Sequence, residues 1–174
     1  MTMQIYNRYE YVSKKFMLIF LTTYSYICME SRLMIMDEIL KKLRYSDQDH
    51  IAVLNAPNDI IKKLDKTLPG VQIDTEINAR YLYDFMIIFT HDSHEVKRLG
   101  PTCIQNLSDD GKLWMVYPKG TSRKYSSDIN RDNGWDPVLE TGMRGVSQVS
   151  VDDDWSALRF RNARYIKSAK ESHR

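Results

Sequence analysis

The sequence predicts an α/β protein of the Rossmann-like, three-layer type, with a mostly parallel sheet and an antiparallel hairpin at its C-terminal end. Short apolar runs alternate along the chain with stretches of helical period, as they do in βαβ units. One run, FMIIF at residues 85–89, is apolar throughout, which is typical of a strand buried on both faces. Residues 146–151 and 155–160 alternate with period two around three aspartates, which predicts the hairpin at the sheet edge.

The first half of the pattern predicts a strand, a turn and a helix. The apolar run at residues 51–54 is closed by Asn55-Ala56-Pro57. A helix should then begin at Asn58 or Asp59, because apolar residues follow at helical spacing. Pro69-Gly70 should end that helix.

The second half repeats this alternation. Residues 85–89 should form the centre of the sheet, and Asp92 is placed to cap a following helix. Gly100-Pro101 should break or kink that helix. Residues 108–111 (SDDG) are predicted to be a turn that delivers another strand at residues 113–117.

Composition favours one neutral domain. The 174 residues are 43% hydrophobic and 28% charged, which is enough for one core and short for two. Of the 25 basic and 23 acidic residues, four and two fall in the first 35, so the remainder is balanced. We therefore expect no nucleic-acid partner, because that requires a basic surface. The two cysteines, Cys28 and Cys103, fit a reducing compartment and show no zinc spacing.

The first 35 residues differ from the rest, since they hold none of the seven glycines or five prolines. We expect residues 1–35 to be an extension, with a start assigned too far upstream and a domain opening at Met36. A signal or membrane-surface anchor is the alternative, because apolar residues 16–21 follow two lysines. The domain should span residues 36–162, and residues 163–174 should form a basic tail. The expected location is cytoplasmic, or membrane-associated or exported if the segment from Phe16 to Met29 acts as a signal.

Parallel strands place their ligand sites beyond their carboxyl ends, so the residues that follow each strand are the candidates. Asn55, Lys119, Ser122 and Asp152 could hold a small anionic ligand or a protein partner there. Asn55 offers a donor and an acceptor, and Lys119 offers positive charge beside the Ser122 hydroxyl. The other interpretation of the segment around Lys119 is an ordinary solvated turn, and we favour it there.

Metal and phosphate motifs are weak. His91 and His94 could share a helix face and bind a metal, but exposed histidines beside a capped helix start explain the same residues better. The aspartates at 152–154 could chelate magnesium, although a hairpin turn favours aspartate too. Lys119-Gly120-Thr121-Ser122 lacks the upstream glycine of a Walker loop. We therefore expect no metal site, and no cofactor is firmly indicated.

Four motifs in order carry a resemblance that covers roughly residues 50–161: VLNAP, YDFMIIF, DGKLWMVYPKGTS and VDDDWSALRF. The combination resembles a family of small bacterial proteins catalogued as a domain of unknown function, and it implies a Rossmann-like fold. The order of elements from Tyr83 to Phe160 is also similar to the second half of class I methyltransferases. The chain departs from those enzymes after the first strand, where Asn55-Ala56-Pro57 stands in place of a glycine-rich cofactor turn.

Two functions remain open on the sequence. The favoured hypothesis is a non-catalytic Rossmann-like binding or regulatory module, because the glycine turn is missing and no paired acid and base is evident. The alternative is an enzyme, a divergent transferase of the methyltransferase-like type.

Overall fold

The computed structural model describes residues 35–166, in which six strands form one sheet in the order β2-β1-β3-β4-β6-β5. Strands β1, β2, β3 and β4 are parallel, while β6 runs antiparallel to both β4 and β5. The strands are β1 (His50–Leu54), β2 (Gln72–Asp74), β3 (Tyr83–Phe89), β4 (Leu107–Pro118), β5 (Met143–Ser150) and β6 (Trp155–Asn162). The predicted fold class is confirmed.

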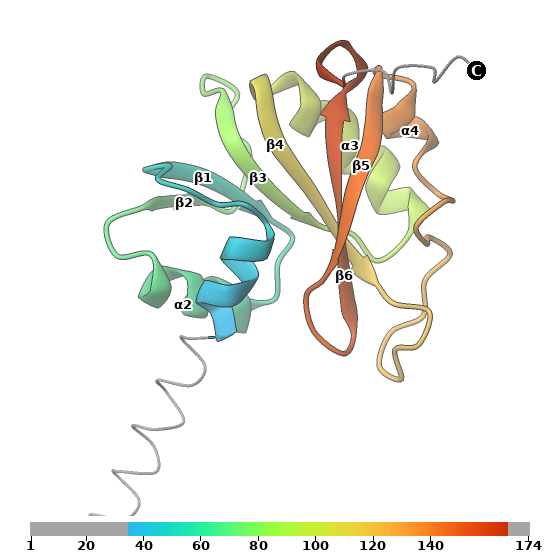
Figure 1. The fold of residues 1–174 in the computed structure, drawn as a ribbon, viewed down its shortest axis with the longest axis horizontal. Coiled ribbons are helices and arrows are strands. Elements are labelled where there is room, and N and C mark those ends of the chain that lie inside the picture. Colours follow the sequence, from blue (N-terminus) through green and yellow to red (C-terminus); the bar gives the residue numbers. More distant parts are fainter. Residues whose placement is uncertain (1–34, 167–174) are drawn as a thin grey trace, which may run out of the picture.

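Helices cover both faces of the sheet (Figure 1). The helix over residues 35–42 and α2 (Asn58–Thr67) lie on one face, where their buried leucines join alternate residues of β1, such as Ile51 and Val53. Helix α3 (Ser93–Gln105) and the short α4 (Asp136–Leu139) cover the opposite face. A 3-10 turn, Ala163–Tyr165, ends the described chain. Successive side chains of each strand point to opposite faces of the sheet, so the strands contribute to two separate apolar layers.

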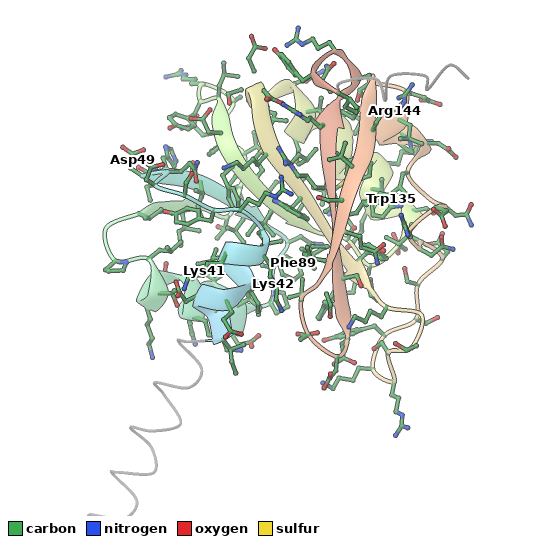
Figure 2. The ribbon with its side chains drawn as sticks, viewed as in Figure 1. Lys41, Lys42, Asp49, Phe89, Trp135 and Arg144 are labelled. Carbon is green, nitrogen blue, oxygen red and sulfur yellow. The ribbon has the colours of Figure 1, made fainter. Side chains whose placement is uncertain are left out.

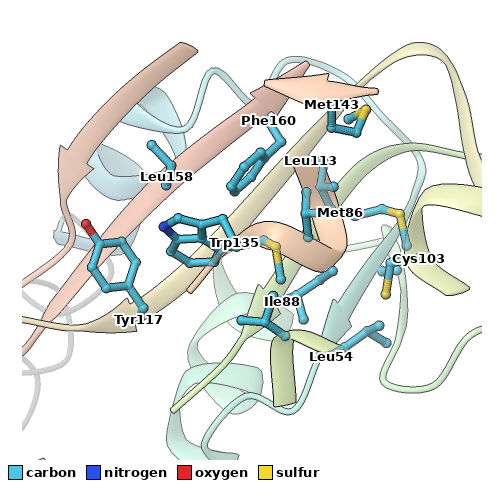
Figure 3. Close-up of a cluster of buried hydrophobic side chains, with 14 of the residues drawn as sticks. Leu54, Met86, Ile88, Cys103, Leu113, Tyr117, Trp135, Met143, Leu158 and Phe160 are labelled. Carbon is cyan, nitrogen blue, oxygen red and sulfur yellow. The ribbon is translucent and has the colours of Figure 1, made fainter. Parts of the chain in front are cut away.

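The larger apolar layer packs beneath α3 and α4. Figure 3 shows Trp135, which precedes α4, beside Tyr117 of β4 and Phe160 of β6. Its ring centroid lies 5.3 Å from that of Tyr117 and 5.2 Å from that of Phe160. This contact anchors the long segment after β4 to the antiparallel half of the sheet.

Of the predicted break or kink at Gly100-Pro101, the break was wrong, because α3 continues through both residues. Val96 and Cys103 are fully buried on either side of the proline, so core packing holds the helix across the missing hydrogen bond. Gly100 serves packing instead: a Cβ there would stand 2.9 Å from Cγ2 of Val138 in α4. The glycine at position 100 therefore marks a close contact between α3 and α4.

The predicted turn at residues 108–111 was also wrong, since these residues belong to β4. Tyr83 of β3 pairs with Leu107 and Phe85 with Lys112, so the extra residues of β4 form a bulge. Asp110 has a left-handed φ of 58° there, and its carboxylate accepts two hydrogen bonds from Arg161. These turn-like residues can belong to the strand because the bulge takes them out of the hydrogen-bonded pairing with β3.

The proposed boundaries of the domain stay predictions. The extension, its signal-like segment and most of the basic tail lie outside the described residues. None of the helices between residues 35 and 166 has the length and apolar character that a membrane span needs.

Candidate functional site

We call the space beyond the carboxyl ends of β1 and β3 the crevice, because the strand order reverses between these two strands. From β1 the chain moves outward to β2, and it then returns to pair β3 with the other side of β1. Parallel α/β sheets bind ligands at such a reversal of strand order. Asn55 follows β1 and Thr90-His91 follows β3, so these residues border the crevice.

Asn55 is held in a conformation that glycine usually supplies. Its φ is 55°, in the left-handed region, and asparagine is among the few other residues that enter this region readily. Its side-chain Nδ2 donates to the carbonyl oxygen of Phe89 at 3.0 Å, which ties the ends of β1 and β3 together. The turn therefore has a glycine-like backbone without a glycine.

Glu95, in the first turn of α3, links the two sides of this crevice. Its Oε2 accepts from the backbone N–H of His91 at 2.7 Å and lies 3.2 Å from Nδ1 of the same histidine. Burial raises the pKa of Glu95, but hydrogen bonds from the His91 N–H and from Asn55 outweigh it and leave the pKa below its ordinary value. Glu95 is thus kept ionised beside an imidazole.

The helix that presents Glu95 begins as the sequence predicts. Asp92 is its N-cap, and the Asp92 carboxylate accepts from the N–H of Glu95 at 2.8 Å. Ser93 is anchored separately, because its N–H donates to Asp128 at 2.9 Å. These bonds fix the start of α3, and with it the direction of the His91 and Glu95 side chains.

Aromatic rings form a wall beside His91. Its ring centroid lies 5.2 Å from Trp155 and 5.8 Å from Tyr125, both with edge-on geometry. Phe89 completes the group 5.4 Å from Trp155. Figure 2 shows Phe89 at the end of the sheet that faces the helix over residues 35–42. The His91 side chain is 40% exposed, so one part of its ring stays open to solvent.

Three of the four predicted ligand residues lie in the hairpin region instead. The Lys119 Nζ donates to the Ser150 hydroxyl at 2.8 Å and to the Asp152 carbonyl oxygen. Ser122 donates to Asp154 at 2.9 Å, and the Asp152 carboxylate accepts from the N–H groups of the turn after it. Asp152 also lines an apolar cavity of about 230 Å³ on the α2 face. Asn55 and Lys119 share the carboxyl edge, but they make different local contacts.

Because Lys119 is engaged in surface hydrogen bonds, we expect Lys119→Ala to lower the free energy of unfolding by at most about 1 kcal/mol. Urea unfolding followed by circular dichroism measures this change. Lys124→Ala, which removes the ion-pair partner of Asp154 near the same turn, is the matched comparison. A loss from Lys119→Ala well above 2 kcal/mol would show that the lysine organises the hairpin.

The structure reveals a second polar group that the sequence did not suggest. Asp74, at the end of β2, accepts from His50 Nε2 at 2.7 Å and from the Tyr83 hydroxyl on the same oxygen. The Tyr81 ring lies against His50 with centroids 4.0 Å apart and the ring planes tilted by 41°. This group ties together β1, β2 and β3 across 33 residues of sequence, so no local pattern could have predicted it.

Burial, together with the hydrogen bond to Asp74, raises the pKa of Tyr83 to about 12. An unfolded tyrosine ionises near pH 10. The resulting stability is therefore complete below about pH 10 and is lost as the pH rises towards 12. We expect Tyr83→Phe to flatten this alkaline loss in urea unfolding at pH 8 to 11. Tyr165→Phe, at a half-buried position far from Asp74, should retain the wild-type dependence; an unchanged slope in Tyr83→Phe would contradict the assignment.

The two histidines considered as metal ligands separate in the structure. His91 faces Glu95 and the aromatic wall, whereas His94 is exposed. Across residues 35–166, no three His, Cys, Asp or Glu side chains come close enough together to hold a metal ion.

Comparison with known proteins identifies the architecture. No family model and no curated protein matches the sequence. Among solved structures, a phosphoethanolamine N-methyltransferase 2 from Haemonchus contortus, in complex with phosphomonomethylethanolamine and S-adenosylhomocysteine, matches with a TM-score of 0.51 and 10% identity over 74% of this chain. The pyocyanin biosynthetic protein PhzM matches with a TM-score of 0.52 and 11% identity, also over 74%. The fold is methyltransferase-like.

The chain spans 37% of the length of the N-methyltransferase and 54% of PhzM. The similarity nevertheless overturns the favoured expectation of a non-catalytic binding module, because the fold that the chain shares is that of an N-methyltransferase. The expectation that the chain is no enzyme falls with it. The resemblance to a small bacterial family has no matching family model and stays a prediction.

Proposed function

We propose that the chain is a divergent methyltransferase-like transferase that works at the crevice between β1 and β3. The observation that carries this proposal is the coincidence of two features at one place. A methyltransferase-like sheet reverses its strand order there, and an imidazole paired with a carboxylate borders the same crevice.

S-adenosylmethionine is the cofactor that this fold implies, and residues at the crevice fit it. Asn55 gives the first turn a left-handed backbone, as a glycine would. The N–H groups of Asn58 and Asp59, at the start of α2, make no backbone hydrogen bond within residues 35–166 and could receive a carboxylate.

Asp74 does not add to this fit. It ends β2, twenty residues after Leu54, where Rossmann-like proteins carry the acid that binds ribose hydroxyls. However, Asp74 pairs with Ala52, and its carboxylate accepts from His50 and Tyr83, the first residues of β1 and β3. The carboxylate therefore lies toward the amino ends of the strands, away from Asn55. Asn55 and the first N–H groups of α2 are what we propose to hold the cofactor.

When bound, S-adenosylmethionine supplies an electrophilic methyl group. The chain itself removes a proton from the substrate that accepts the methyl group, and Nε2 of His91 receives that proton. Glu95 orients the ring through Nδ1 and stabilises the imidazolium that forms, as a carboxylate does beside a catalytic histidine. Trp155 and Tyr125 exclude water from one side of the ring.

Calorimetric titration with S-adenosylmethionine tests the proposal. We expect Asn55→Gly to keep the affinity within about threefold, because glycine adopts the same φ. Asn55→Val should weaken binding at least about tenfold, since a β-branched residue resists the left-handed turn. Asn133→Val, an exposed asparagine in the loop before α4, is the control and should bind like the wild type. Absence of binding in the folded wild type would refute the proposal.

A further inference from the structure

Three unpaired polar groups lie in one row across the antiparallel half of the sheet. Trp114 Nε1, Ser147 Oγ and Arg159 Nε are buried and have no hydrogen-bond partner within residues 35–166. Trp114 of β4 pairs with Arg159 of β6, and Arg159 pairs in turn with Ser147 of β5. All three atoms can donate a hydrogen bond, so the row is a concentration of unused donors.

A β-bulge creates this alignment. Gly145 pairs with Phe160 and Ser147 with Arg159, so Val146 is the extra residue in β5. The bulge places the serine, rather than the valine, opposite the arginine, and leaves Val146 39% exposed. Bulges commonly re-aim a side chain in this way near functional sites.

Arg159 is a buried arginine that forms no ion pair within residues 35–166. The residue is only 9% exposed, and its guanidinium makes no hydrogen bond within residues 35–166. Burial, followed by repulsion from Arg44 and Arg161, lowers its pKa from the ordinary value, and attraction to Asp110 offsets this only in part. An uncompensated buried charge is costly, and native proteins rarely keep one without a purpose.

The row borders a concave, positively charged pocket. Arg44, Arg159 and Arg161 line a cavity of about 340 Å³ together with Ser147, and Val146, Tyr165 and Ile166 supply its less polar wall. Asp110 pairs with Arg161 at 2.5 Å and also attracts Arg159, but neither Arg44 nor Arg159 forms an ion pair among the described residues. The pocket is formed by β5, β6 and the end of the helix over residues 35–42, so it is separate from the crevice at Asn55.

We infer that this pocket is a second binding site, for an organic anion whose phosphate or carboxylate group is held by Arg44, Arg159 and the Ser147 hydroxyl. Guanidinium groups bind such oxyanions with charge-assisted hydrogen bonds. The wall of Tyr165, Ile166 and Val146 suits the organic part of the ligand. The site does not depend on the proposed transferase activity.

Calorimetric titration with phenyl phosphate and with benzoate, at constant ionic strength set by chloride, tests the inference. Comparing the affinity for phenyl phosphate with that for benzoate shows whether the site prefers a phosphate or a carboxylate group. Arg44 is exposed, so Arg44→Gln should fold normally and weaken binding at least about tenfold. Arg98→Gln removes an exposed arginine on α3, on the opposite face, and should bind like the wild type. No binding of either anion, or an equal loss in Arg98→Gln, would overturn the inference.

Arg159→Met gives an independent readout. Methionine fills the space of the arginine stem without a buried charge, so without anion this variant should melt a few degrees above the wild type. It should also lose the rise in melting temperature that phenyl phosphate gives the wild type. A lower melting temperature in the absence of anion would show that the protein itself satisfies Arg159, and would contradict the proposed site.

Discussion

Replacing His91 with glutamine should lower the rate of methyl transfer by about 100- to 10,000-fold, the usual contribution of a general base. On the proposed function, His91 takes the proton of the acceptor, while Asn55 and the start of α2 hold the cofactor. The backbone N–H of residue 91 still donates to Glu95 in this variant, so the local structure should persist. Binding of S-adenosylhomocysteine should therefore change by no more than about twofold.

The rate can be measured with methyl-labelled S-adenosylmethionine and a cell extract as the source of acceptors. His94→Gln is the matched control, since His94 follows His91 by three residues, in the first turn of α3, but is exposed and makes no hydrogen bond to Glu95 within the described chain. Equal transfer rates in the two variants would remove His91 from the mechanism. Loss of cofactor binding in His91→Gln would instead assign the histidine to the binding site.

Trp155→Ala should destabilise the protein by about 3 to 5 kcal/mol. The indole is 6% exposed, and it packs against Phe89, His91 and Tyr125 with ring centroids 4.8 to 5.4 Å apart. Removing it opens a cavity at the start of β6 and takes away one wall of the His91 ring. A loss of this size is a large fraction of the stability of a typical domain.

Urea unfolding monitored by circular dichroism gives the size of this effect. Trp155→Phe keeps an edge-on aromatic contact and should cost less than half as much as the alanine variant. A loss below about 1 kcal/mol in Trp155→Ala would mean that the ring contributes little to the core, and that the aromatic wall is not rigid.

The sequence predicted the parts of the fold that depend on local pattern. The apolar run at residues 85–89 became β3, the third of six strands in the sheet order, because a strand covered on both faces has no polar side. Asp92 caps α3 and the aspartates at 152–154 turn the β5–β6 hairpin, since both effects depend on neighbours in sequence. Pro101 misled the prediction because tertiary packing around Val96 and Cys103 outweighed a local signal.

The candidate site depended on contacts that local pattern cannot show. Asn55 was predicted as a ligand residue, but its link to Phe89 and Glu95 exists only because β1 and β3 are neighbours. The missing glycine argued against an enzyme at the level of sequence. In the structure, the left-handed φ of Asn55 supplies the backbone shape that a glycine would have given. Residue identity was therefore a poor guide to the geometry of this turn.

The anion pocket illustrates the same limit. Arg159 lies between the apolar residues Leu158 and Phe160 in β6. In a strand whose side chains alternate between two faces, a charged residue at such a position predicts an exposed side chain. Arg159 is buried because the β5 bulge and the residues after the helix at 35–42 cover that part of the sheet. Only the three-dimensional register brings it beside Ser147 and Trp114.

The central claim is that the crevice between β1 and β3 binds S-adenosylmethionine, and a titration of ¹⁵N-labelled protein with S-adenosylhomocysteine tests it most directly. The account predicts saturable shifts in the amide signals of residues 55, 56, 58 and 59 after β1 and of residues 90–92 after β3. Residues around Ser147 and Arg159, at the separate anion pocket, should shift little. No shifts at saturating ligand, or shifts confined to Ser147 and Arg159, would contradict the proposed function.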